Sequence, residues 1–159
     1  MVANSQPQSP VIRESKISHK SPVLHPLARF ITEETVALHF NIHVDQIYRI
    51  ECLRHVVYVH GKGVSKFVSY ADFPPILGVE PPTAEDWVRW RKRWRSKWKS
   101  NQAPEFWQKF YAHQFQQAIS VLNLFEWGKL VALVKSALSE VALQQLRAVY
   151  TYEKELWDF

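Results

Sequence analysis

One segment, residues 83–100, constrains the fold of this chain more than any other part of the sequence. It opens with the capping sequence Thr-Ala-Glu-Asp and then carries Trp87, Trp90, Trp94 and Trp98 at intervals of three, four and four residues. Those intervals place all four rings on one stripe of an α-helix. The sequence therefore predicts a helix whose tryptophan face needs other apolar residues to cover it.

Three interpretations of the tryptophan stripe are open. The rings can pack in the core, stack on single-stranded bases if they are exposed, or lie on a membrane surface. We favour the core, because apolar helices elsewhere in the chain are available to cover a helix that lies in mid-chain. An aromatic pocket for a small ligand between residues 87 and 127 is a further possibility.

The opposite side of the same segment is basic. Residues 83–100 contain seven basic and two acidic residues, a net charge of +5 that equals the net charge of the whole chain. If the tryptophans are core, this face is free to bind phosphates, and such binding weakens as salt rises. The alternative is a solvated charged face with no ligand. The expected phosphate contacts are Arg89, Arg91, Lys92 and Arg95.

The C-terminal third is rich in apolar residues at helical spacing. It predicts a helix over 104–122 and two more over 125–137 and 139–154, either separate or continuous. These residues exceed what a short helix needs, so we expect a core together with a homodimer interface. A monomeric helical core is the alternative. The expected interface residues are Leu130, Leu133, Val134, Leu138, Val141, Leu146 and Val149.

A helix-turn-helix pattern is present between residues 32 and 53. Thr32 suits the start of the first helix, and Ala37 is the small residue that a close helix crossing requires. Asn41 tolerates the left-handed conformation needed in the turn. Ile47 and Ile50, three residues apart, then predict a second helix over 43–53 that packs on the first.

A hairpin is expected directly after this unit. Residues 56–70 are rich in β-branched and aromatic residues, which favour strands. Gly61 and Gly63 lie between the two strand-like runs, where a hairpin turn needs positive φ. The Asp-Phe-Pro sequence at 72–74 ends the unit, and a proline-rich connector follows it.

The helix-turn-helix followed by a wing resembles the MerR and excisionase type of winged helix-turn-helix, over residues 31–73. It is also similar to compact MerR-type regulators of mobile elements, such as those of cyanobacterial CRISPR-associated transposons. The resemblance implies that the second helix enters the major groove and that the wing contacts phosphates. The Arg-Tyr-Tyr run frequent in that family is absent here. The implied DNA contacts are His43, Asp45, Gln46, Tyr48, Arg49, Arg54, Lys62 and Lys66.

Composition argues against several other classes. A single cysteine, Cys52, excludes an internal disulfide and the zinc sites that need two thiolates. The sequence shows no glycine-rich phosphate loop, metal-ligand motif, close acidic pair or nucleophile with a base, so we expect no enzyme, cofactor or metal. It has no long apolar run and no secretory signal, and we expect a cytoplasmic, nucleoid-associated protein without a membrane partner.

The expected fold is mainly α with a small β-hairpin: a winged helix-turn-helix plus a C-terminal helical dimerisation region. The expected parts are a disordered basic arm (1–28), the winged unit (29–73), a connector (74–82) and a helical region (83–159). The expected function is a homodimeric repressor that binds an inverted repeat in double-stranded DNA. The alternatives are an excisionase-like architectural protein, or an assembly factor whose basic helix contacts RNA or lipid.

Overall fold

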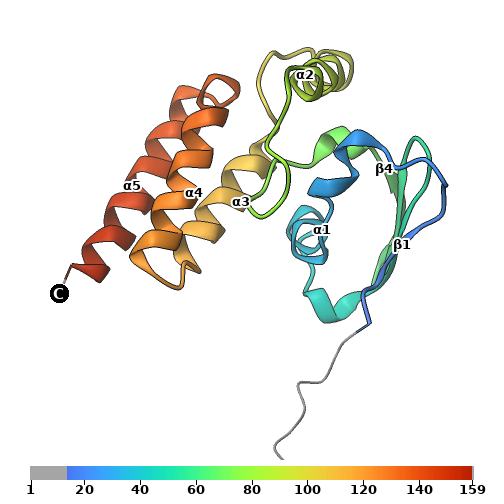
Figure 1. Ribbon diagram of the computed structural model, residues 1–159, viewed down its shortest axis with the longest axis horizontal. Helices are drawn as coiled ribbons and strands as arrows, with labels where there is room; N and C mark the ends of the chain where they lie inside the picture. Colours follow the sequence, from blue (N-terminus) through green and yellow to red (C-terminus); the bar gives the residue numbers. More distant parts are fainter. Residues whose placement is uncertain (1–13, 159) are drawn as a thin grey trace, which may run out of the picture.

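The computed structural model describes residues 14–158. Its N-terminal half combines a four-stranded sheet with one α-helix (Figure 1). The strands are β1 (Ile17–His19), β2 (Ile47–Cys52), β3 (Val57–Gly61) and β4 (Val64–Val68), in the spatial order β1-β2-β3-β4. The helix α1 (Glu33–Phe40) lies between β1 and β2 in the chain, and these two strands are parallel, whereas β2, β3 and β4 are antiparallel.

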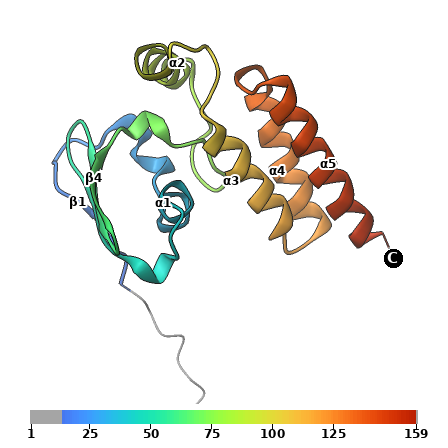
Figure 2. The ribbon, with the colours of Figure 1, turned by 180° about the vertical axis from the view of Figure 1, so that it is seen from behind.

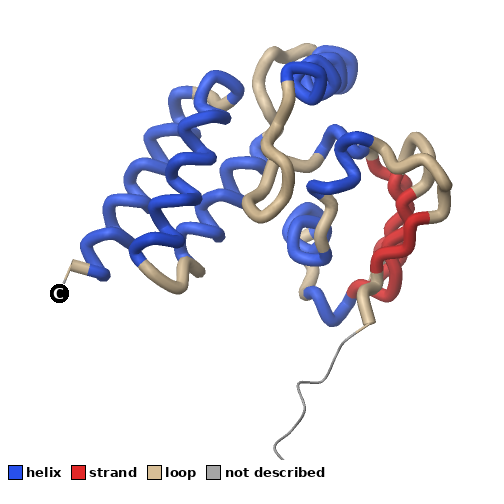
Figure 3. The backbone as a smooth tube through the Cα atoms, viewed as in Figure 1, coloured by secondary structure: helices blue, strands red, loops and turns tan. Residues whose placement is uncertain are grey.

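The C-terminal half of the described chain is helical. It consists of α2 (Ala84–Trp98), α3 (Glu105–Gln116), α4 (Val121–Val134) and α5 (Glu140–Trp157). Four short 3-10 turns complete the fold: η1 (Pro26–Phe30), η2 (Val44–Gln46), η3 (Tyr70–Asp72) and η4 (Lys135–Ala137). The sheet and the α4–α5 pair lie on opposite sides of the molecule, with α1 and α3 between them (Figures 2 and 3). The prediction of a mainly helical fold is confirmed, and the predicted hairpin is part of a larger, four-stranded sheet.

The sheet buries one of its two faces. The helix α1 lies on one side of the sheet (Figure 1). Ile50 of β2 and Val57 and Val59 of β3 are fully buried and share one core cluster with Val36 and Ala37 of α1. The residues that alternate with them point to the other face, which no element of the described chain covers in Figures 1 and 2. We call this surface the outer sheet face.

The predicted second helix over 43–53 is wrong. Only the short turn η2 follows Asn41, and Ile47 opens strand β2. A register irregularity between Ile47 and Arg49 lets Ile47 and Ile50 both face the core from a strand, although a regular strand would place them on opposite faces. A bulged strand thus reproduces the i, i+3 spacing of a helix. A helix-turn-helix with a recognition helix is absent from the described residues.

The disordered arm is a second expectation that the structure corrects in part. Residues 1–13 of the arm lie outside the described residues. The remainder contains β1, which pairs with β2 through Ile17 and Ile50. Leu27 of η1 is fully buried. The apolar residues spaced through this polar stretch therefore suffice to join it to the core.

The hairpin prediction is confirmed by β3 and β4. Gly63 at its tip has a φ of 73°, as the turn requires. Gly61 has a different role, because a Cβ built there would lie 2.8 Å from the backbone oxygen of Gln46. It permits the close approach of η2 to the sheet.

The tryptophan stripe is mostly core. Trp90 and Trp94 are completely buried and Trp87 is half-buried, whereas Trp98 at the end of α2 is 42 % exposed. The connector that precedes the helix is also packed, since the Tyr111 hydroxyl donates to the Pro75 carbonyl at 2.8 Å. The first half of the connector is therefore a structural part of the core.

The expected dimer interface is largely internal. The side chains of Leu130, Val134, Leu138 and Leu146 are buried within the chain, and Val149 is half-buried against the same core. Leu133 and Val141 are exposed. The predicted helical spacing is right. The assignment to a dimer interface is wrong for most of these positions, because α3 packs on the α4–α5 pair and buries them within the chain. Homodimerisation stays a prediction.

Candidate nucleic-acid interface

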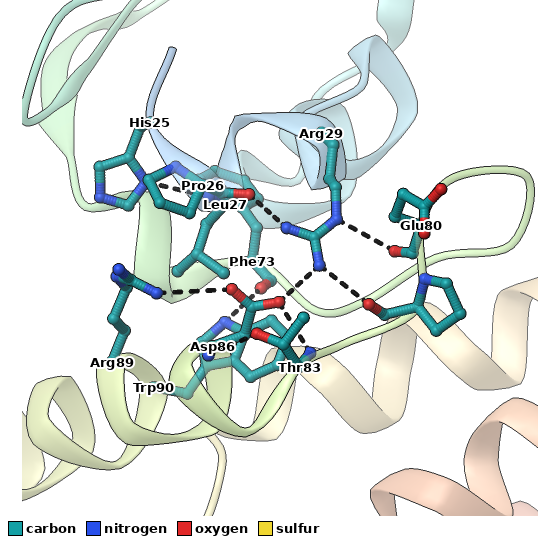
Figure 4. A network of polar contacts seen from close by, with 11 residues as sticks. His25, Pro26, Leu27, Arg29, Phe73, Glu80, Thr83, Asp86, Arg89 and Trp90 are labelled. Carbon is teal, nitrogen blue, oxygen red and sulfur yellow. Dashed lines mark hydrogen bonds and ion pairs between the residues drawn. The ribbon is translucent and has the colours of Figure 1, made fainter. Parts of the chain in front are cut away.

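A buried ion pair fixes the start of α2 to the N-terminal half (Figure 4). Arg29 of η1 donates to the carboxylate of Asp86, which is 1 % exposed. The same guanidinium donates to the carbonyls of Glu80 and Pro81, each at 3.0 Å. Asp86 also closes the capping box with Thr83, because the Thr83 N–H donates to its carboxylate at 2.9 Å. One arginine therefore joins η1, the connector and α2.

The charge state of Asp86 follows from these contacts. Burial alone would raise the pKa of its carboxyl group. The hydrogen bond from Arg29, the bonds at the Thr83 cap and the positive charge of Arg29 outweigh burial and hold that pKa below its ordinary value. The carboxylate is therefore ionised and anchors the helix as a charged group.

A second set of bonds fixes the middle of α2. Arg93 donates to the Asp72 carboxylate at 2.9 Å, and the indole N–H of Trp90 donates to the Phe73 carbonyl at 3.0 Å. From α3, the indole of Trp107 donates to the Asp72 carbonyl at 3.1 Å. The face of α2 that bears Trp90 and Arg93 is thus committed to the core, and the helix cannot turn this face to a ligand without losing these bonds.

The side of α2 that remains in contact with solvent carries free cations. Arg91, Lys92 and Arg95 line a shallow depression of about 700 Å³ together with Val88 and Ser96. Within residues 14–158, Arg91 and Lys92 form no ion pair or hydrogen bond, and Arg95 bonds only to the amide oxygen of Asn101 at 3.0 Å. We call Arg91, Lys92 and Arg95 the α2 basic stripe. No acidic residue lines the depression, so it favours an anion.

Arg89 does not belong to this stripe. Its guanidinium lies 3.6 Å from the second carboxylate oxygen of Asp86. The prediction that the α2 cations form a free basic face therefore corresponds in the structure to Arg91, Lys92 and Arg95, while Arg89 is held in the anchor of Figure 4.

The outer sheet face is aromatic. Phe67 on β4 is 64 % exposed and Tyr48 on β2 is 56 % exposed. The Phe67 ring lies 5.0 Å from that of Tyr58, and the Tyr48 ring lies 5.1 Å from that of His60. The Arg49 guanidinium stands 5.8 Å from the Tyr58 ring centre. Exposed rings beside a cation on an uncovered sheet face can stack on planar ligands.

The DNA contacts expected from the resemblance lie in different places. His43, Asp45 and Gln46 lie in and beside η2, where the Gln46 side chain accepts from the His43 N–H at 2.9 Å. Arg54 lies in the turn after β2, and Lys62 and Lys66 are exposed on the hairpin. Of the eight expected residues, only Tyr48 and Arg49 belong to the outer sheet face.

The sequence interpretation missed Tyr58, His60 and Phe67 as candidate ligand contacts. The signal was available, because Tyr58 and His60 alternate with Val57 and Val59 along the first strand of the predicted hairpin, and Phe67 lies opposite Tyr58 on the second strand.

Within residues 14–158, no cluster of three or more His, Cys, Asp or Glu side chains could hold a metal ion. Cys52 is buried beside the Tyr70 hydroxyl, and its burial raises the pKa of the thiol. No helix of the described chain is long and apolar enough to span a membrane.

The chain matches no protein-family model, no curated protein and no solved structure. The surfaces of the described residues therefore have to indicate the function.

Proposed function

We propose that this protein binds nucleic acid, with the α2 basic stripe contacting the phosphates. The observation that carries the proposal is that two cations of this stripe, Arg91 and Lys92, have no partner within residues 14–158, on a helix whose other side is locked into the core. Because the buried tryptophans and the Arg29–Asp86 pair hold the helix in place, the backbone that carries the stripe is preorganised, and binding a phosphate there orders only the side chains.

The outer sheet face supports a preference for unpaired bases. Exposed aromatic side chains such as Tyr48 and Phe67 stack on bases of any sequence, and each such contact is worth about 1–3 kcal/mol. Stacking needs splayed bases, which a duplex does not offer. We therefore propose single-stranded nucleic acid as the main ligand. The second candidate is a repressor that binds a duplex operator, since the basic stripe suits duplex phosphates equally well. Such a repressor would bind without a recognition helix.

Insertion of α2 into a lipid surface is less compatible with the geometry. An interfacial helix buries its apolar face among the acyl chains. Here Trp90 and Trp94 are fully buried in the protein core, so insertion would require that core to open.

The test is a fluorescence anisotropy titration of the full chain with a labelled single strand of about 16 nucleotides and with the duplex of the same sequence. The triple variant Arg91→Gln, Lys92→Gln, Arg95→Gln should weaken binding to both ligands. Tyr48→Ala and Phe67→Ala should each weaken binding of the single strand by about 1–3 kcal/mol and leave binding of the duplex unchanged.

A matched control removes three exposed cations elsewhere, with Lys109→Gln, Lys135→Gln and Lys154→Gln. This variant has the same net charge as the stripe variant and should bind much more tightly. Equal losses in the two triple variants would mean that net charge alone matters and would overturn the assignment to α2. Sequence-dependent duplex binding that survives Phe67→Ala would favour the regulator instead.

A further inference from the structure

A groove lies along the seam between α4 and α5. This helix pair is on the side of the molecule away from the sheet (Figure 2). Its volume is about 450 Å³, within the range of sites that bind small molecules. Phe115 of α3, Val131 of α4 and Leu146 of α5 line it with buried apolar side chains. The lining is thus built from three helices.

Two small residues on α4 shape this groove. A Cβ built at Gly128 would lie 2.7 Å from Cε2 of Tyr150, so the Tyr150 ring rests directly on the α4 backbone. The same ring packs against Phe115, with 5.2 Å between ring centres. Ala132, about one turn further along α4, also lines the groove and is exposed. A larger side chain at that position would fill space that a ligand can use.

The charged residues of the lining are all basic. Lys129, Lys135 and Arg147 line the groove, and no acidic residue does. Lys129 lies 5.4 Å from the ring centre of Phe125, and Arg147 has only a loose contact of 3.9 Å with the exposed Glu140. An apolar lining with three cations and no acidic residue suits a ligand that is apolar along most of its length and anionic at one end.

We propose that this groove binds a free acyl carboxylate. The acyl chain lies along the apolar lining between α4 and α5, and the carboxylate pairs with Lys129 and Arg147. Charge-assisted hydrogen bonds to a carboxylate are among the stronger polar contacts of proteins. The site needs no nucleic acid and lies outside both surfaces of the proposed function.

A second copy of the chain is a poorer occupant of this groove. A two-fold dimer places the same patch of both copies face to face. The three cations of one copy would then meet the three cations of the other, which opposes association. The groove charges therefore favour an anionic ligand over self-association at this face.

The experiment is a calorimetric titration of the full chain with decanoate below its micellar concentration, and in parallel with the uncharged 1-decanol. Decanoate should bind with a one-to-one stoichiometry. The double variant Lys129→Gln, Arg147→Gln should weaken the affinity for decanoate by about tenfold or more and leave the affinity for decanol nearly unchanged. Ala132→Trp should abolish binding of both ligands.

Two matched variants on α5 serve as controls. Ala148→Trp adds the same bulk at an exposed position outside the groove lining, and Lys154→Gln removes a charge away from it. Both should bind decanoate like the unmodified chain, as should the α2 stripe variant whether or not nucleic acid binds.

Absence of saturable decanoate binding, or equal affinity for decanoate in the Lys129→Gln, Arg147→Gln variant, would overturn the proposal. Light scattering provides the other decisive readout. If Ala132→Trp converts a dimer to a monomer, the groove is an interface between copies and the acyl site is wrong.

Discussion

His39 shows how a single half-buried residue couples stability to pH. Its ring packs among Phe40, Phe73 and Phe106, with ring centres 4.8, 5.2 and 5.0 Å away. Its Nδ1 is buried without a hydrogen-bond partner in the described structure. Burial lowers the pKa of this histidine, although the charge of Asp72 acts in the opposite direction. The folded state therefore resists protonation that the unfolded chain accepts.

We expect stability to fall as the pH drops below the ordinary histidine pKa of 6.5. Above that pH both states are neutral at this position, so no stability is lost there. His39→Phe keeps an aromatic ring in the cluster and should flatten the decrease, which urea unfolding at several pH values measures. His19→Gln, at an exposed position, is the control. An unchanged profile for His39→Phe would show that other groups carry the pH dependence.

Asn41 is a residue whose backbone conformation could be predicted. It ends α1 with φ 55° and ψ 45°, the left-handed conformation expected from the sequence. Asn41→Val should destabilise the protein by about 1–2 kcal/mol, because a branched side chain is strained in that conformation. Asn41→Gly should be tolerated. Thermal unfolding compares the two, and equal losses would mean that the asparagine side chain matters and the backbone does not.

At the scale of elements, the chain depends on how α2 is attached to the N-terminal half. Arg29 of η1 holds the start of the helix, and Arg93 and the indole of Trp90 attach its middle, each by a contact with a residue distant in the sequence. The contact between Arg29 and Asp86 spans 57 residues. Since the α2 basic stripe lies on this helix, its position relative to the sheet depends on the same bonds.

Arg29→Ala should destabilise the protein by about 3 kcal/mol, because it leaves the buried Asp86 carboxylate without its main partner. The double variant Arg29→Ala, Asp86→Ala should lose less than the sum of the two single losses, since the unpaired charge is gone. Urea unfolding of the four proteins measures this difference. Additive losses would show that the two residues do not interact energetically.

At the scale of the whole molecule, positive charge and aromatic contact area are separated. Residues 32–82, which include the outer sheet face, contain four basic and six acidic residues, whereas 83–100 alone carry a net charge of +5. Affinity for phosphates and affinity for bases should therefore respond to different variants. The α4–α5 groove lies on yet another region of the surface, separate from these two.

The salt dependence of binding tests this separation. The logarithm of the association constant should fall with the logarithm of the salt concentration, because phosphate contacts release counterions. Removing the three cations of the α2 basic stripe should reduce the magnitude of this slope by about 2–3, whereas Phe67→Ala should lower affinity at every salt concentration without changing the slope. A reduced slope in Phe67→Ala would contradict the division of roles.

The sequence by itself determined the elements whose pattern is local. The N-terminal cap and the span of α2, the left-handed Asn41 and the β3–β4 hairpin with Gly63 at its tip are properties of neighbouring residues, and each was predictable. The core position of Trp90 and Trp94 also followed, because a helical apolar stripe has to be covered.

Only the tertiary structure decided between strand and helix at Ile47–Cys52, and between core and interface for Leu130 and Leu146. The segment is a strand because β1 and β3 pair with it on both sides, and the bulge at its start hides the strand period. The two leucines are internal because α3 lies against α4 and α5. Such contacts join residues far apart in the chain, and the spacing of residues within one segment does not reveal which other segments pack against it.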